Sequence, residues 1–252
     1  AARRGTPTAI LDQDAFPGMA TRWLAGRVRE IFLGTPEAVT HLRPGPGTVV
    51  TVTGTPIARP APERRAGAAE RFAIAPSARV VLVMGGSQGS VAVNERVAEW
   101  VDAGLPSDLV LLWVTGKGSF DRFAGYLNLP NVRLFDFLDP VADGYAVADL
   151  VVARAGMTTI AEICAWGLPS ILIPLPTAAA DHQTKNAAAM ALAGAAQVLT
   201  QASTHGRSLG GAVATLLSDP AALAALRERA LARGRPAALD EICGRLEQLV
   251  GP

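Results

Sequence analysis

Residues 79–103 read RVVLVMGGSQGSVAVNERVAEWVDA. The first six, Arg79–Met84, form an apolar run rich in valine, which is typical of a strand buried on both faces of a parallel sheet. A glycine-rich loop, Gly85–Ser90, comes next, and Val91–Ala103 then places apolar residues at helical spacing. This strand–loop–helix unit predicts an α/β fold.

The same alternation continues along the chain. Further strands are predicted at 109–114, 131–135, 149–152 and 170–174, and further helices at 120–127, 158–166 and 182–192. Because apolar strands alternate with helices, we expect a doubly wound parallel sheet with helices on both faces. Two last helices are predicted at 220–233 and 236–250, each with a proline near its first turn.

The first 78 residues carry fewer elements. Strands are predicted at 8–11 and 49–53 and a helix at 19–29, which is too little to bury a sheet of its own. We therefore predict the second half of a Rossmann-like domain at 1–58, a complete α/β domain at 59–235, and a last helix at 236–252.

The composition excludes several classes of protein. Half of the 252 residues are apolar and 18% are charged, unlike a disordered chain or a disulfide mini-protein. The formal charge of +1 argues against a nucleic-acid partner. The two cysteines lie in apolar helical contexts, which favours a reducing compartment. No apolar stretch reaches the roughly 20 residues that a membrane span needs.

The glycine-rich loop GGSQGS, Gly85–Ser90, is the sharpest local motif. It lies between a strand and a helix, where glycines let the backbone approach a ligand and the helix N-terminus attracts an anion. It is neither a dinucleotide fingerprint nor a P-loop, because the GxGxxG and Gly-Lys-Ser/Thr patterns are missing. The loop predicts either a phosphate site or a tight strand-to-helix turn.

A second motif, RAGMTTIAE at 154–162, occupies the same kind of junction. Thr158 and Thr159 are expected to cap a helix and to face a phosphate, while Glu162 can accept hydrogen bonds from a ribose diol. The alternative is an ordinary capped helix with a solvated glutamate. Because ligands bind at the carboxyl ends of parallel strands, two such motifs together favour a nucleotide site.

Two further segments carry polar side chains. In DHQTKN, Asp181–Asn186, the amide of Gln183 suits a sugar hydroxyl, because amides both donate and accept hydrogen bonds. Asp12 and Asp14 form an Asp-x-Asp triplet of the kind that can hold a divalent ion, although a turn is the favoured interpretation. No His/Cys/Asp cluster has metal-ligand spacing, so no metal site is predicted.

In this order the motifs resemble the MurG family of N-acetylglucosaminyl transferases. The resemblance runs from about Thr6 to the C-terminus and is densest in FLDPVADGYAVADLVVARAGMTTIAEICAWGLPSILIP, Phe137–Pro174. It implies the GT-B fold, in which a C-terminal Rossmann-like domain binds UDP-N-acetylglucosamine and an N-terminal one binds a membrane-lipid acceptor. It also implies the inverting conversion of lipid I to lipid II in peptidoglycan synthesis, at the cytoplasmic face of the bacterial inner membrane. The last helix is then expected to pack back on the N-terminal domain.

The resemblance assigns roles residue by residue. Ser87 would contact the diphosphate region, the main chain of Leu138 would bind uracil, and Gln183 would bind the N-acetylglucosamine hydroxyls. Gln88 is also expected among the residues that bind UDP-N-acetylglucosamine. The helix start that holds the diphosphate and the ribose corresponds to Met157, Thr158, Thr159, Ile160, Ala161 and Glu162. No metal or other cofactor is implied; UDP-N-acetylglucosamine is a substrate.

Some positions depart from the family. LDQD, Leu11–Asp14, stands where the family has His-Glu-Gln-Asn, so Asp14 replaces the asparagine expected at the donor sugar. Arg59 lies one residue beyond the family's arginine and is the candidate phosphate contact there. The candidate general base of the family would precede Ala1, so no catalytic residue is assigned.

Two alternative functions stay open. The chain could be the donor-binding half of a split or truncated glycosyltransferase, inactive without an acceptor-domain segment or partner chain. It could also be a metal-dependent glycosyltransferase that uses Asp12 and Asp14. A cluster of apolar and basic side chains either faces the membrane or, as we favour, packs within the N-terminal domain: Phe16, Met19, Arg22, Trp23, Leu24, Arg27 and Arg29.

Overall fold

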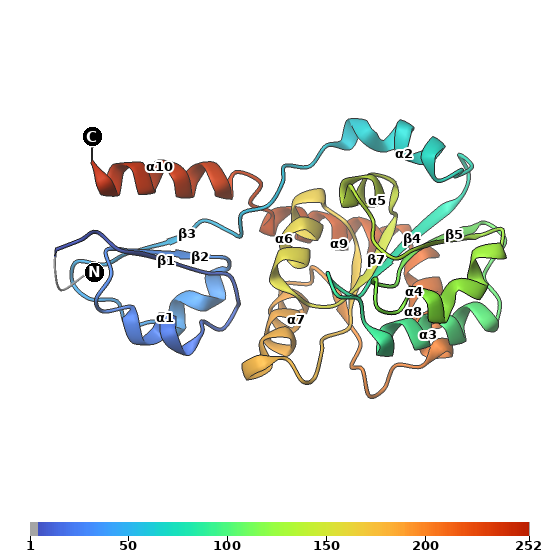
Figure 1. Ribbon diagram of the computed structural model, residues 1–252, viewed down its shortest axis with the longest axis horizontal. Coiled ribbons are helices and arrows are strands. Elements are labelled where there is room, and N and C mark those ends of the chain that lie inside the picture. The colour runs from blue at the N-terminus through green and yellow to red at the C-terminus, as the bar shows by residue number, and fades with distance from the viewer. Residues whose placement is uncertain (1–4, 252) are drawn as a thin grey trace.

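The computed structural model describes residues 5–251 and divides into two units, each built on a parallel sheet (Figure 1). The N-terminal unit has a three-stranded sheet in the order β1-β2-β3. Its elements are β1 (Ala9–Asp12), α1 (Met19–Leu24), β2 (Glu30–Leu33), the 3₁₀ helix η2 (Pro36–His41) and β3 (Val49–Val52). This unit covers part of the segment that we predicted as the second half of a Rossmann-like domain.

The C-terminal unit has a six-stranded parallel sheet in the order β6-β5-β4-β7-β8-β9. The strands are β4 (Arg79–Met84), β5 (Leu109–Val114), β6 (Val132–Phe135), β7 (Leu150–Ala153), β8 (Ser170–Leu172) and β9 (Gln197–Val198). The order reverses at β4, which pairs with both β5 and β7. The doubly wound α/β architecture is confirmed, and its switch point lies beside the glycine-rich loop.

Helices cover both faces of this sheet. The helical elements after β3 are η3 (Pro62–Arg64), α2 (Arg65–Arg71), α3 (Val91–Asp102), α4 (Phe120–Phe123), η4 (Ala124–Asn128), α5 (Val141–Val147), α6 (Met157–Trp166), η5 (Ala179–Asp181), α7 (His182–Leu192), α8 (Gly206–Leu217), α9 (Pro220–Arg233) and α10 (Ala238–Val250). Side chains of α2, α5, α6 and α7 form one hydrophobic core with the sheet, and those of α3, α4 and α8 form the other.

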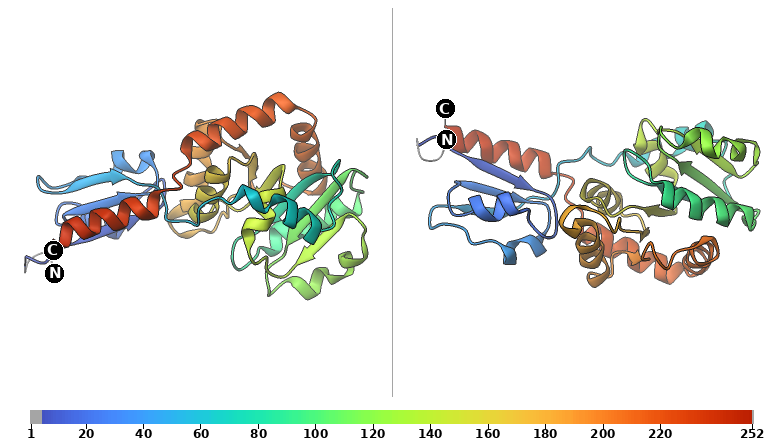
Figure 2. Two further views of the ribbon diagram at one scale, coloured as in Figure 1. Left: turned by 90° about the horizontal axis from the view of Figure 1, so that it is seen from above. Right: turned by 60° about the horizontal axis from the view of Figure 1, so that its bottom comes forward.

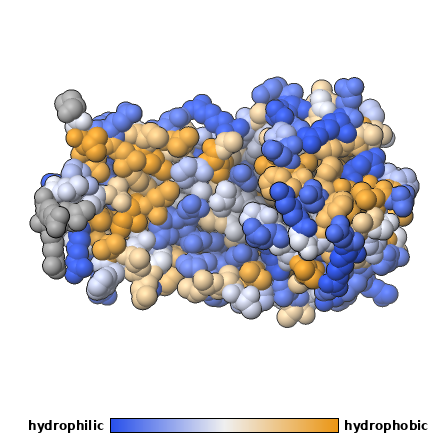
Figure 3. All heavy atoms as spheres, in the orientation of Figure 1, coloured by the Kyte–Doolittle hydropathy of each residue, from blue (hydrophilic) through white to orange (hydrophobic). Residues whose placement is uncertain are grey.

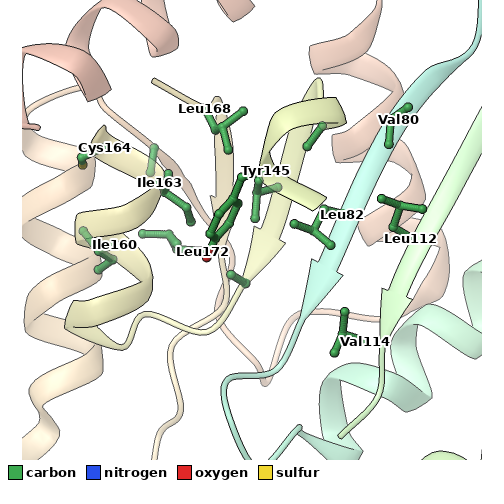
Figure 4. Close-up of a cluster of buried hydrophobic side chains, with 14 of the residues drawn as sticks. Val80, Leu82, Leu112, Val114, Tyr145, Ile160, Ile163, Cys164, Leu168 and Leu172 are labelled. Atoms are coloured by element: carbon green, nitrogen blue, oxygen red, sulfur yellow. The ribbon is translucent and has the colours of Figure 1, made fainter. Parts of the chain in front are cut away.

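Strand β4 explains why the apolar run is unbroken. Val80 and Leu82 belong to the first core, which Figure 4 shows, whereas Val81 and Val83 belong to the second. Because side chains alternate between the faces of a strand, both sets must be apolar when both faces are covered. All four side chains are at most 1% exposed.

Several predicted elements differ from the structure. The helix predicted at 19–29 ends at Leu24, and the segment after it turns into strand β2 at Glu30–Leu33, which we did not predict. The segment predicted as a helix at 120–127 is a four-residue α-helix followed by a 3₁₀ helix. The helices α2, α5 and α8 and the short strand β9 were not predicted either. In α8, GRSLGGAVATLL, three glycines weaken the helical signal, and packing on α3 compensates for it.

The last helix lies beside the N-terminal sheet, as Figures 1 and 2 show. The guanidinium of Arg245 on α10 donates to both carboxylate oxygens of Glu30 on β2, at 2.9 to 3.1 Å. Figure 3 shows hydrophobic residues gathered over this part of the molecule. The boundaries at 58/59 and 235/236 stay predictions.

The favoured interpretation of the apolar and basic cluster was wrong for all of its members except Phe16. Met19 and Trp23 on α1 are 79% and 75% exposed, and Leu24, Arg22, Arg27 and Arg29 are exposed as well. Phe16 does have neighbours, because its ring lies 4.6 Å from that of His41.

No single described helix is long and apolar enough to cross a membrane, although α8 passes that test jointly with the α9–α10 segment, across a bend of 91°.

Candidate functional site

A cavity of about 580 Å³ opens at the carboxyl ends of the central strands of the six-stranded sheet. The ends of β4 and β5 border it at Met84 and Val114, and the starts of the loops after β6 and β7 form its sides. Most of the predicted UDP-sugar contacts line it: Ser87, Gln88, Leu138, Met157, Thr158, Thr159, Glu162 and Gln183. The sequence motifs therefore meet at one place.

The glycine-rich loop forms one wall of the cavity. Gly89 adopts a φ of +73°, and a Cβ atom there would lie 2.1 Å from the carbonyl oxygen of Thr115. Only glycine fits this close approach. The hydroxyl of Ser90 accepts a hydrogen bond from the amide of Val93 at 3.4 Å and so caps α3, whose N-terminus begins beside the cavity.

The N-terminus of α6 forms the opposite wall. The helix begins at Met157 after Gly156, and no side chain caps it, so the expected capping role of Thr158 and Thr159 is wrong. Both threonines lie within the first turn, too far along to be N-cap residues. The hydroxyl of Thr158 instead donates to the side-chain oxygen of Gln13 at 3.4 Å. Within residues 5–251 no side chain accepts a hydrogen bond from the first N–H groups of α6, so these groups are available to an anion.

Glu162 lies one turn into α6, half-buried, with its carboxylate at the cavity. The hydroxyl of Tyr145 donates to its Oε2 at 2.8 Å. Burial raises the pKa of Glu162 above 4.5, and the hydrogen bond from Tyr145 opposes part of that rise. The site thus holds a carboxylate that is fixed by a buried donor.

Gln183 is the second residue of α7. Its side-chain oxygen accepts a hydrogen bond from the amide of Leu175 at 3.0 Å, which ties it to the proline-rich loop after β8. The fixed carbonyl leaves the NH₂ group to donate elsewhere. Leu138, after β6, is 4% exposed and contributes to the cavity lining and to the core.

Arg154 lines the cavity but was not among the predicted site residues. It is 4% exposed and forms no ion pair among residues 5–251. Its guanidinium donates to neutral acceptors, the hydroxyl of Ser90, the carbonyls of Ile173 and Pro174, and the side chain of Gln201. Burial lowers the pKa of Arg154. A charged residue directly after the apolar strand β7 was the available signal.

Some predicted site residues lie elsewhere. Ile160 and Ala161 line a smaller cavity of about 200 Å³ between the two units rather than the main one. Arg59 lies between the units and pairs with Asp240 at the start of α10, with its side chain 70% exposed. It does not line the main cavity.

Asp14 connects the two units instead of lining the cavity. Its carboxylate accepts a hydrogen bond from the amide of Asn186 at 2.8 Å, and its other oxygen lies 3.4 Å from Nδ1 of His182. The side-chain oxygen of Asn186 accepts in turn from the backbone amide of Ala15 at 2.9 Å. Nearby, the ammonium of Lys185 lies 3.9 Å from the centre of the Phe16 ring. The predicted contact of Asp14 with the donor sugar stays a prediction.

Asp12 is engaged within its own loop, where its carboxylate accepts from the amides of Asp14 and Gly18 at 3.3 and 2.8 Å. Across residues 5–251 there is no group of three or more His, Cys, Asp or Glu side chains placed to hold a metal ion.

Comparison with known proteins shows which family this chain is similar to. Residues 80–242 match the glycosyltransferase family 28 C-terminal domain. The chain is 39% identical to a relative from Solidesulfovibrio magneticus over 94% of its length and 37% identical to one from Desulforudis audaxviator over all of it. Both relatives are named UDP-N-acetylglucosamine--N-acetylmuramyl-(pentapeptide) pyrophosphoryl-undecaprenol N-acetylglucosamine transferase.

Solved structures of other proteins have a similar fold. MurG of Acinetobacter baumannii superposes with a TM-score of 0.77 at 26% identity, covering 98% of this chain and 69% of that one. The UDP complex of Staphylococcus aureus MnaA superposes with a TM-score of 0.69 at 15% identity, which supports the fold alone. The aligned region spans 66% and 69% of the two curated relatives, so the chain spans about two thirds of their length. With these matches over nearly its whole length, the chain belongs to the MurG family of GT-B glycosyltransferases.

Proposed function

We propose that the cavity of about 580 Å³ binds UDP-N-acetylglucosamine. One observation carries the proposal: the loop that leads into the N-terminus of α3, the N-terminus of α6 and the side chain of Glu162 line the same cavity. Helix N-termini attract a diphosphate, and a fixed carboxylate accepts hydrogen bonds from a ribose diol. A nucleoside diphosphate carries both groups in one molecule.

With the diphosphate and the ribose placed in this way, we can propose contacts for the base and the sugar. We expect the main chain at Leu138 to bind the base and the NH₂ group of Gln183 to donate to a sugar hydroxyl; both residues line the cavity. The loop residues Ser87 and Gln88 are exposed at the cavity, where they can reach the diphosphate.

We propose that the bound sugar is transferred, with inversion, to the pyrophosphoryl-undecaprenol-linked N-acetylmuramyl pentapeptide that the relatives' names specify. UDP is then the leaving group. The two helix N-termini and the buried cation of Arg154 stabilise its developing charge without reorganisation. These groups supply the positive charge, so the proposal requires no metal ion or other cofactor.

The acceptor would bring the protein to the cytoplasmic face of the inner membrane. The exposed apolar side chains of Met19 and Trp23 lie on the same short helix as Arg22, and such a mixture suits a surface of anionic lipids. We propose that acceptor binding also involves an additional segment, on this chain or on a partner chain, because the matched relatives are longer than the region aligned here.

Calorimetric titration of the chain with UDP-N-acetylglucosamine, UDP and a GDP-sugar tests the donor proposal. We expect the two uridine nucleotides to bind at least about tenfold more tightly than the GDP-sugar, since a site that hydrogen-bonds one base leaves polar groups unpaired with another. Repeating the titration with a chelator should change nothing. Equal affinity for the uridine and guanosine nucleotides would refute the donor assignment.

Transfer is measured separately with a water-soluble, lipid-linked acceptor. The chain is assayed alone and with the N-terminal third of the Desulforudis audaxviator relative supplied in trans. Activity only in the mixture supports the additional segment, whereas activity of the chain alone contradicts it and leaves the donor proposal intact.

A further inference from the structure

Tyr145 has no direct contact with the cavity and yet holds a group that lines it. The residue lies on α5, is 2% exposed, and is one of the largest side chains in the first core, where Figure 4 shows it among leucine and isoleucine side chains. Its hydroxyl donates to Oε2 of Glu162 on α6 at 2.8 Å.

The direction of this hydrogen bond is fixed by packing. The Tyr145 ring lies 6.0 Å from that of Trp166, and both neighbouring strands supply buried aliphatic side chains. A buried phenol ring of this kind has one orientation, and its hydroxyl must find a polar partner. In the described structure that partner is the carboxylate of Glu162.

A glutamate side chain has three rotatable bonds, so an unsupported carboxylate samples many positions. The bond from Tyr145 removes that freedom and leaves Oε1, together with one lone pair of Oε2, to accept hydrogen bonds from the cavity side. A carboxylate with two acceptors at fixed positions matches a pair of vicinal hydroxyls.

We propose that Tyr145 is the positioning residue for Glu162 and that this pair makes the site selective for ribonucleotides over nucleotides that lack the ribose diol. The inference rests on the proposed function, because it assumes a uridine nucleotide in the cavity. It adds a residue that never touches the ligand.

The test is the ratio of the affinities for UDP and for its 2′,3′-dideoxy analogue, measured by calorimetry. Tyr145→Phe keeps the ring and removes only the hydroxyl. We expect this variant to bind UDP about three- to tenfold more weakly, as for the loss of one hydrogen bond, and to bind the dideoxy analogue as the wild type does. If the role of Tyr145 were purely structural, the variant would bind both ligands more weakly by the same factor, and the ratio of the two affinities would not change.

The chain offers a matched control. Tyr126, the other tyrosine, donates from its hydroxyl to the carboxylate of Asp102 at 3.0 Å, and its ring packs against that of Trp113 in the second core. Tyr126→Phe removes the same kind of hydrogen bond away from the cavity. We expect it to leave the ratio at the wild-type value.

A double-mutant cycle separates the two proposals. In the background of Glu162→Gln, Tyr145→Phe should have no further effect on the ratio, because the two residues act through one carboxylate. If the wild type itself does not prefer UDP to the dideoxy analogue, the ribose role of Glu162 fails and the proposed function with it. If the wild type shows the preference, Glu162→Gln removes it and Tyr145→Phe keeps it, only the role of Tyr145 is refuted.

A second variant covers the case in which Tyr145→Phe does not fold. Glu162→Asp retains Tyr145 and the negative charge but is shorter by one methylene, so its carboxylate cannot reach both the phenol hydroxyl and the diol. We expect this variant also to have a reduced ratio of the affinity for UDP to that for the dideoxy analogue. A ratio equal to that of the wild type would overturn the positioning role of Tyr145.

Discussion

Glu162 is the residue in which burial and ligand recognition oppose each other. Burial favours its protonated form and raises its pKa, while the phenol of Tyr145 stabilises the charged form. A protonated carboxyl has lost one of its acceptor positions, so ribose binding requires the ionised form. UDP-N-acetylglucosamine suits a test of this side chain, because its diphosphate is a diester and, unlike the terminal phosphate of UDP, does not titrate at about pH 6.

We expect UDP-N-acetylglucosamine binding to weaken as the pH is lowered toward the raised pKa of Glu162, beginning above the ordinary glutamate value of 4.5. The sign follows because the deprotonated form binds and the raised pKa moves protonation to higher pH. Glu162→Gln should bind UDP-N-acetylglucosamine more weakly at neutral pH and should lose this dependence. Calorimetric titrations from pH 5 to 8 measure both. A variant with the same pH profile as the wild type would assign the dependence to another group.

At the scale of elements, the loop between β4 and α3 decides whether the cavity forms. Its backbone lies directly against the turn that follows β5: a Cβ atom on Gly89 would meet the carbonyl of Thr115, and one on Gly116 would meet Gly89. The wall of the cavity is therefore two backbones in contact. That arrangement leaves no room for any side chain between them.

Gly89→Ala should destabilise the fold and weaken UDP binding together. The positive φ costs a non-glycine residue about 1–2 kcal/mol, and the overlap with Thr115 adds to it because a backbone carbonyl cannot move aside. Thermal unfolding and UDP titration are the measurements. Gly118→Ala is the control, since a Cβ atom there meets nothing within 4 Å and its φ is not positive. Equal behaviour of the two variants would show that the close contact is unimportant.

Helices and strands with a clear local pattern of apolar residues could be predicted from the sequence. Those that are stabilised by contacts with residues distant in sequence could not. Strand β4 was predicted to the residue because burial on both faces demands an unbroken apolar run. Strand β2 was missed because the charged Glu30 begins it, and that carboxylate is held by Arg245 from the far end of the chain. At the site, the glycine-rich loop and Glu162 stand in recognisable motifs. Arg154 had a local signal, a charged residue directly after an apolar strand, but its partners Ser90 and Gln201 are distant in sequence. Tyr145 acts through Glu162, 17 residues away, and no local pattern records that contact.

At the scale of the molecule, few polar contacts hold the two units together. The carboxylate of Glu37 on η2 accepts two hydrogen bonds from Arg233 on α9, both at 2.9 Å. Burial raises the pKa of Glu37, but the hydrogen bonds and the charge of Arg233 outweigh it and hold that pKa below 4.5. The contact between Asp14 and Asn186 joins the units on the side of the main cavity.

Glu37→Gln should lower the stability by about 1 kcal/mol at neutral pH, the size expected for a partly exposed ion pair. Because the folded-state pKa is lowered, this stabilisation is fully present above pH 4.5 and is lost as the pH falls through the lower value. The thermal unfolding temperatures of wild type and variant should therefore differ at pH 7 and converge only when the pH falls below the lowered pKa of Glu37. Glu63→Gln, at an exposed glutamate without an ion pair in residues 5–251, is the control. A difference that persists at low pH would contradict the role of the ion pair.

The chain crosses between the units twice, once after β3 and once between α9 and α10 (Figure 2). The two crossings touch, since a Cβ atom on Gly54 would lie 2.4 Å from the Cβ of Arg235. Because the two tethers touch, a bend in one of them must also displace the other. We therefore expect this contact to be the pivot of any rotation of one unit relative to the other.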